Sequence, residues 1–147
     1  MKDINEILAS AKASSEETFW NGPVPISEVE KLEELLGCRL PNDFRCFLEA
    51  SGGGGFIDSE ISGIEDGDAA NSNGGTVYGD TLRCREEYGL PVNGVVIFFR
   101  DEEICWCLCK EQDAWVVRSY SLHKRKYEKI LYSSFTDFFD EYVELRR

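Results

Sequence analysis

The sequence lacks any apolar run long enough to cross a membrane, since a helical span needs about 18 residues or more. Its longest apolar candidate, Val95–Phe99, has only the length of one strand. Residues 1–12 are amphipathic and charged, without the apolar core of a signal peptide. We therefore expect a domain that does not enter membranes and that works in the cytoplasm.

Basic residues are scarce: 16 Lys and Arg stand against 28 Asp and Glu, so the net charge is −12. Between Arg45 and Arg83 there is no Lys or Arg at all. The acidic residues of that stretch are Glu49, Asp58, Glu60, Glu65, Asp66, Asp68 and Asp80. We expect no direct binding to nucleic acid, because binding phosphates needs clustered Lys and Arg. Two interpretations stay open for the acidic stretch, a solubilising surface or a docking face for a basic protein.

Disulfides and metal sites are not expected, although the chain has six cysteines. A chain of 147 residues can build its own core and needs no disulfide bonds to hold it. Cys105, Cys107 and Cys109 alternate along ICWCLC, which places them on one face of a strand, in a line that does not converge on a metal. We predict reduced, buried cysteines that act as small hydrophobic residues.

The glycine run SGGGGF at residues 51–56 does not fit a phosphate-binding loop. A P-loop leads from a strand into a helix and ends in Lys followed by Ser or Thr. Here a helical pattern precedes the glycines, and the next Lys is Lys110. The run therefore indicates the end of a helix, where glycine adopts positive φ without steric cost, followed by a tight reversal.

No catalytic, cofactor-binding or metal-binding residue is predicted. The acidic segment Asp66–Asn71 lacks the oxygen ligand at position five and the glycine at position six of a calcium loop. The single histidine, His123, lies in the basic stretch LHKRKYEK without an identifiable nucleophile beside it. We predict that the chain is not an enzyme, and a small hydrolase using His123 or a cysteine is the disfavoured alternative.

Five helices are expected from apolar residues at helical spacing and from helix-capping signals. The first contains Ile4 to Ala11. A capping box of Ser27 and Glu30 would open the second, and Gly37 would end it. The third is expected to have Pro41 as its first helical residue and Phe44, Phe47 and Leu48 on its apolar side. The others are expected from Asp80 as the N-cap through residue 87, and after a second box formed by Ser134 and Asp137.

Strands are expected in the middle of the chain. VVIFF, ICWCLC and WVVRSY are separated by the short polar segments RDEE and KEQDA, the spacing of an antiparallel meander, and KYEKILY would add an edge strand. FIDSEISGI and residues 76–78 are weaker strand candidates. We predict one α+β domain over residues 1–147, with a central, mostly antiparallel sheet and the N-terminal and C-terminal helices packed on one face.

The order of these segments resembles the SUKH superfamily. The resemblance begins with Trp20-Asn21-Gly22-Pro23 and the helix from Ser27 to Gly37. It continues with Leu40-Pro41, Asp43-Phe44, Phe47-Leu48 and the glycines at 52–55. Later elements agree: an acidic loop, Asp80-Thr81-Leu82-Arg83, the VVIFF and WVV strands, and Ser134-Phe135 followed by Phe138-Phe139. The similarity covers nearly the whole chain, although the family usually has Asn-Gly-Gly where this chain has four glycines.

The resemblance implies an immunity protein that binds a toxin protein and blocks it. Members of the superfamily include eukaryotic cell-wall regulators and bacterial immunity proteins encoded beside polymorphic toxins. A nuclease toxin has a basic cleft, which an acidic protein could occlude without covalent chemistry. A cytosolic regulatory or scaffold protein is the alternative, and homodimerisation stays open. The residues that we predict to contact the partner are Asp58, Glu60, Glu65, Asp66, Asp68, Glu102 and Trp106.

Overall fold

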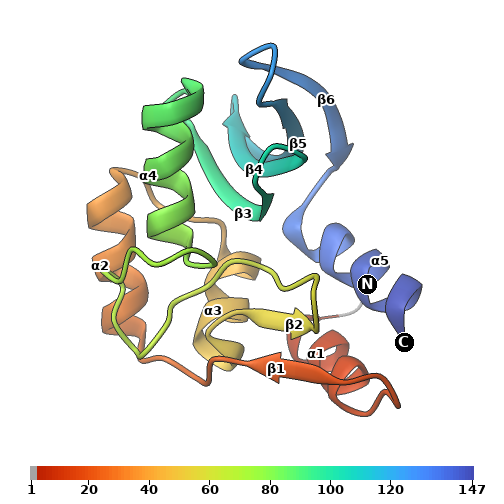
Figure 1. Cartoon of the computed structure of the whole chain (residues 1–147). Helices are drawn as coiled ribbons and strands as arrows, with labels where there is room; N and C mark the ends of the chain where they lie inside the picture. Colours follow the sequence, from red (N-terminus) through yellow and green to blue (C-terminus); the bar gives the residue numbers. More distant parts are fainter. Residues whose placement is uncertain (1–2) are drawn as a thin grey trace.

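The computed structural model describes residues 3–147. The helices are α1 (Ile4–Lys12), α2 (Ile26–Leu36), α3 (Asn42–Ser51), α4 (Val77–Tyr88) and α5 (Phe135–Arg146). The strands are β1 (Thr18–Trp20), β2 (Gly54–Phe56), β3 (Gly94–Arg100), β4 (Ile104–Glu111), β5 (Ala114–Ser121) and β6 (Lys126–Tyr132) (Figure 1). The prediction of one domain over residues 1–147 stays a prediction, and Met1 and Lys2 lie outside the described residues.

The central sheet is the antiparallel meander that the sequence predicts. Strands β3, β4, β5 and β6 pair with their neighbours in chain order. Strands β1 and β2 form a separate two-stranded antiparallel sheet. Helices α1, α2, α3 and α5 gather at the lower part of the molecule in Figure 1, and α4 stands beside β3. The α+β class and the placement of the terminal helices are confirmed.

The two faces of the four-stranded sheet bury different sets of side chains. One face, which carries Val95, Leu108 and Val117, packs into the main core with the N-terminal helices and α5. The other face carries the alternating cysteines and packs with Cys84 of α4 and Leu90. The register between β3 and β4 shifts after Val96. The apolar strands are therefore buried from both sides, by α4 on one face and by the other helices on the opposite face.

Local signals fixed several helix ends as expected. Gly37 and Gly52 both adopt positive φ, 78° and 70°, at the residue that ends α2 and α3. Ser134 caps α5, because its Oγ accepts a hydrogen bond from the Asp137 N–H at 3.0 Å. These ends depend on residues close together in the chain, which explains why the sequence alone predicted them.

Two predicted N-caps are wrong. Helix α2 begins at Ile26 after Pro25, so Ser27 lies inside the first turn and forms no capping box. Helix α4 begins three residues before Asp80, and Thr76 caps it by accepting from the Gly79 N–H at 3.0 Å. The short strand predicted over residues 76–78 is therefore the start of this helix. The strand predicted in FIDSEISGI is also wrong, because β2 covers Gly54–Phe56 and ends at the first residue of that segment.

Asp80 is buried within the first turn of α4, where it joins the helix to the long loop before it. Its carboxylate accepts from Ser62 Oγ at 2.8 Å and from the Gly75 N–H at 3.2 Å. Burial raises the pKa of Asp80 above its ordinary value of 3.8, and the two hydrogen bonds oppose this rise. The folded state therefore holds a proton on Asp80 more tightly than the unfolded state does.

We predict that Asp80→Asn raises the free energy of unfolding at pH 7, by up to about 1 kcal/mol. The amide accepts from Gly75, donates to Ser62 and carries no buried charge. In the wild type, the contribution of Asp80 to stability falls as the pH rises from about 3.8 through the raised folded pKa. Urea unfolding between pH 4 and 8 measures both effects, with the exposed Asp113→Asn as the control. Lower stability of Asp80→Asn at pH 7 would contradict the prediction.

Candidate functional site

The acidic loop over residues 57–76 is fixed to the domain at two places. Beside α2, Asp68 accepts from Lys31 Nζ at 3.2 Å, and Glu28 accepts from the Ala69 N–H at 2.9 Å. The pKa of Asp68 is lowered, first by the Ala70 N–H and then by Lys31. Part of this acidic group is therefore already paired within the chain.

The near end of the loop contacts β3 and α5. The backbone carbonyl of Asp58, a residue with φ of 71°, accepts from the Arg100 guanidinium. The Ser59 carbonyl accepts from the Tyr142 hydroxyl at 2.8 Å. Figure 1 shows the loop running from the end of β2 across the molecule to α2. Its carboxylates are therefore distributed over two places.

The predicted partner-contacting residues fall into two groups. Glu65, Asp66 and Asp68 belong to the part of the loop beside α2. Asp58 and Glu60 belong to the end beside Arg100, which stacks on Phe98 at 5.3 Å, and the Phe98 ring lies 5.3 Å from that of Trp106. Glu102 lies in the β3–β4 turn. These placements leave partner contact itself a prediction.

Trp106 lies at the margin of the main core. It occupies the face opposite the cysteines, as the alternation predicts. Its ring packs edge-on against Phe138 of α5 at 5.9 Å and lies 6.5 Å from Tyr132. It is half-buried, so the residue both contributes to the core and presents surface.

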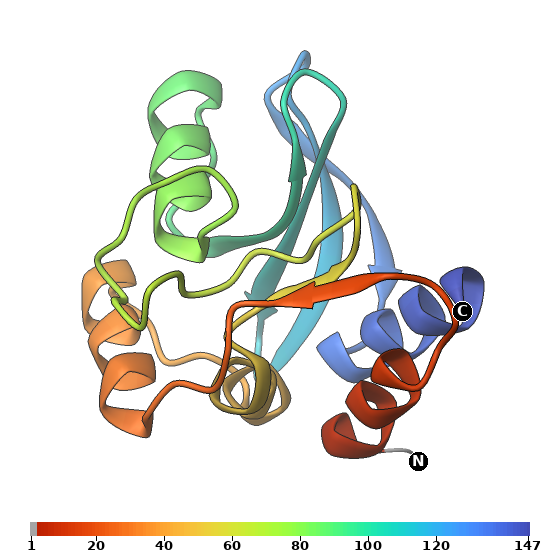
Figure 2. The same cartoon turned by 60° about the horizontal axis from the view of Figure 1, so that its bottom comes forward.

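A cleft that the sequence did not indicate lies between the ends of the two hairpins. We call it the hairpin cleft, with a cavity volume of about 390 Å³. It is lined by residues 102–106 on one side, by residues 119–123 on the other, and by Glu128, Lys129 and Leu131. In Figure 2 the β3–β4 and β5–β6 turns lie at the same end of the sheet. No sequence signal marks the cleft, because it depends on where strand pairing stops.

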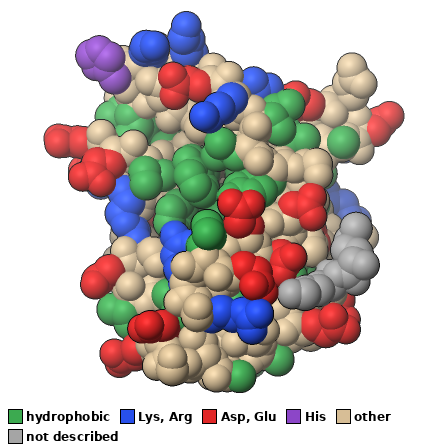
Figure 3. Space-filling model, turned by 90° about the vertical axis from the view of Figure 1, so that its right-hand side faces the viewer, with side chains coloured by type: hydrophobic (Ala, Val, Ile, Leu, Met, Phe, Trp, Pro, Cys, Tyr) green, Lys and Arg blue, Asp and Glu red, His purple; other side chains and the backbone are tan. Residues whose placement is uncertain are grey.

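The lining of the hairpin cleft is mixed, and its margin is acidic on the side of the β3–β4 turn and basic at the β5–β6 turn, residues 122–125. Ile104, Trp106 and Leu131 line it together with Glu102 and Glu103. A smaller hollow, formed by Tyr88, Glu102, Leu122, His123 and Arg125, shares residues with it. Figure 3 shows hydrophobic side chains gathered near the middle of the face that carries β6 and α5, with both basic and acidic side chains around them.

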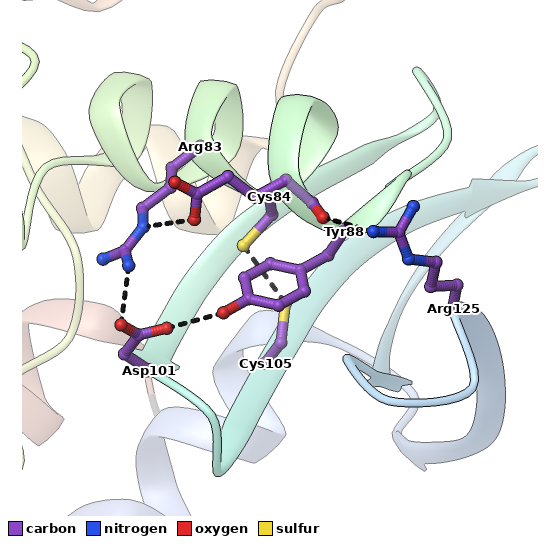
Figure 4. A network of polar contacts seen from close by, with 7 residues as sticks. Arg83, Cys84, Tyr88, Asp101, Cys105 and Arg125 are labelled. Atoms are coloured by element: carbon purple, nitrogen blue, oxygen red, sulfur yellow. Dashed lines mark hydrogen bonds and ion pairs between the residues drawn. The ribbon is translucent and has the colours of Figure 1, made fainter.

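Helix α4 connects both sides of the cleft through a network of polar contacts (Figure 4). Asp101 of the β3–β4 turn accepts from Arg83 at 2.6 Å and from the Tyr88 hydroxyl at 2.7 Å. Arg125 of the β5–β6 turn donates to the Glu87 carbonyl at 2.7 Å. These contacts lower the pKa of Asp101, the Tyr88 hydroxyl first and Arg83 next. One helix thus fixes the position of both turns.

The buried cysteines form a line of thiols under α4. Cys105 Sγ lies 3.8 Å from Cys84 Sγ and 3.7 Å from Cys107 Sγ, and none of the six cysteines is in a disulfide. Burial raises the pKa of Cys109 to about 11, which disfavours the reactive thiolate. Among residues 3–147, no group of three or more His, Cys, Asp or Glu side chains is arranged to hold a metal ion.

Comparison with known families identifies the fold. A family model described as SMI1-KNR4 cell-wall, SUKH_5, matches residues 4–144. The chain belongs to the SUKH superfamily. This SUKH domain therefore shares its family with immunity proteins and with SMI1-KNR4 regulators, proteins that bind other proteins. In the described part of this SUKH protein, no helix is both long enough and apolar enough to span a membrane.

Proposed function

We propose that this protein is a cytoplasmic immunity protein that binds a toxin and neutralises it without performing catalysis. The observation that carries the proposal is the acidic loop in a SUKH domain, within a stretch without Lys or Arg from residue 46 to residue 82. Nuclease domains bind phosphates through basic clefts, and an acidic surface competes for such a cleft. The proposed mechanism is non-covalent occlusion of the toxin's active site.

Two exposed aspartates allow the two ends of the loop to be tested separately. Asp58 and Asp66 both have positive φ, which asparagine tolerates well, so Asp→Asn removes charge with little backbone strain. Complementary charge accelerates association more than it strengthens the final complex. If one end of the loop contacts the toxin, removing the aspartate charge at that end should lower the association rate, and removing the charge at the other end should not.

The test is co-expression with the C-terminal domain encoded by the neighbouring toxin gene. We expect the wild type to restore growth and to co-purify with this domain. Asp58→Asn or Asp66→Asn should slow association roughly two- to fivefold at low salt, and the difference should shrink at high salt. Asp113→Asn, in the turn at the opposite end of the sheet, is the matched control and should have no effect. A wild-type chain that neither rescues growth nor co-purifies would overturn the proposal.

The alternative is a regulatory or scaffold protein that binds another cytosolic protein. The match to the SMI1-KNR4 cell-wall description favours this alternative, because the superfamily also contains regulators. A toxin gene beside the coding gene is required by the immunity proposal and is not required by the regulatory one. Genomic context therefore separates the two.

A further inference from the structure

The pairing between β4 and β5 stops before either strand ends. The last pair at this end is Trp106 with Ser119. Beyond this pair, the first two residues of β4, Ile104 and Cys105, pair only with β3. The last two residues of β5, Tyr120 and Ser121, pair only with β6. The inner edges of the two hairpins therefore border the hairpin cleft instead of each other.

The cleft is held in place by contacts on both sides. The β3–β4 turn is tied to α4 through Asp101, and the β5–β6 turn is tied to it through Arg125. The Tyr120 hydroxyl also donates to the Tyr88 carbonyl at 2.7 Å. A site that is already formed before binding loses less entropy when a partner enters it.

The chemistry of the cleft selects the kind of segment that it can bind. Sheet edges that are not paired can accept an added strand, whose main chain forms the hydrogen bonds while its alternate side chains determine specificity. Apolar surface from Ile104, Trp106 and Leu131 suits one apolar side chain. Glu102 and Glu103 lie together on the side of the β3–β4 turn, so a Lys or Arg of the partner is favoured on that side of the cleft, away from the basic β5–β6 turn.

We propose that the hairpin cleft binds an extended segment of the toxin, with one apolar and one adjacent basic residue, which adds as a short strand to the β4 and β5 edges. This inference rests on the proposed function and names the part of the toxin that is recognised. It assigns recognition of the segment to the cleft and electrostatic attraction to the acidic loop. The two surfaces then have separate roles in one complex.

A variant that fills the cleft tests the proposal. Ser119→Phe places a ring beside Trp106 on the neighbouring strand, a cross-strand aromatic pair that sheets accommodate. Ala114→Phe, at the exposed opposite end of the same strand, is the matched control. Glu103→Lys tests the acidic margin, with Asp113→Lys as its control. Thermal unfolding of each variant establishes that it is folded.

The readouts are calorimetric titration with the C-terminal toxin domain, hydrogen exchange, and light scattering of the free chain. We expect Ser119→Phe to weaken binding at least tenfold and Glu103→Lys severalfold, with both controls unchanged. Amides in residues 104–106 and 119–122 should gain protection in the complex. Unchanged binding by Ser119→Phe, or protection confined to residues 57–76, would overturn the inference while the proposed function stands.

Two other outcomes would show that the hairpin cleft does not bind a toxin segment. A wild-type dimer that Ser119→Phe dissociates would show that the cleft binds a second copy of the chain, which overturns the toxin segment as occupant. A wild-type chain that does not bind the toxin domain would overturn the proposed function and this inference together.

Discussion

Replacing Phe47 with alanine is expected to lower the free energy of unfolding by about 3–5 kcal/mol. Phe47 is fully buried in α3, and its ring lies 4.9 Å from that of Phe139 and 5.0 Å from that of Phe135. Trp20 of β1 packs edge-on against it at 6.4 Å. Removing the ring leaves a cavity where α3, α5 and β1 meet, because such dense packing cannot collapse to fill it.

Phe19→Ala is the matched control for this prediction. Phe19 is 57% exposed on β1, so the same chemical change should cost less than about 0.5 kcal/mol. Urea unfolding of both variants gives the comparison. The free energy of unfolding of a domain of this size is about 5–15 kcal/mol, so the loss in Phe47→Ala is large enough to unfold a marginally stable domain. Phe47→Leu is a milder variant that keeps part of the buried apolar volume. Equal losses for Phe47→Ala and Phe19→Ala would contradict the packing argument.

Replacing Gly53 with valine is expected to cost about 3–5 kcal/mol, from backbone strain and from steric overlap together. Gly53 has φ of 90°, and a Cβ there would lie 2.3 Å from the Gly63 Cα. Its carbonyl accepts from the Asn21 N–H at 3.0 Å. The glycine run thus lies where the chain at residue 21 and the chain at residue 63 both come close.

Two other glycines separate the causes of that loss. Gly67 has φ of 64° in open space, so Gly67→Ala should show only the backbone strain, about 1–2 kcal/mol. Gly74 lies in open space without positive φ, so Gly74→Ala should be nearly neutral. Urea unfolding of the three variants checks the order. Unchanged stability of Gly53→Val together with lost toxin binding would mean that the glycine run is a contact site.

The glycines matter for function through the acidic loop. Gly52 accepts from the Ile64 N–H at 2.8 Å, and Gly54 exchanges backbone hydrogen bonds with Ile61. These bonds hold residues 61–64 against the end of α3 and β2. They therefore fix the loop between Asp58 and Asp66, which is why a change among the glycines would also shift the charges that we propose to meet the toxin.

The sequence alone predicted the features that depend on neighbouring residues. Gly37 and Gly52 end helices because only glycine adopts positive φ without steric cost. Ser134 caps α5 because its hydroxyl reaches the N–H three residues later. The strands of the meander followed from apolar runs separated by short polar turns. The sequence also predicted the acidic character of the candidate surface, since net charge follows from composition.

Only the tertiary structure decided the features that depend on distant residues. The cap expected at Asp80 is wrong because α4 begins earlier, after Thr76, and Asp80 instead accepts from Ser62 and Gly75 of the distant loop. Strand β1 was not predicted, since its three residues become a strand only by pairing with β2. Likewise, no local pattern states where β4 and β5 stop pairing. The composition determined that this protein has an acidic surface. The division of the acidic residues between two places and the position of the hairpin cleft depend on contacts between residues far apart in the chain, so only the tertiary structure decided them.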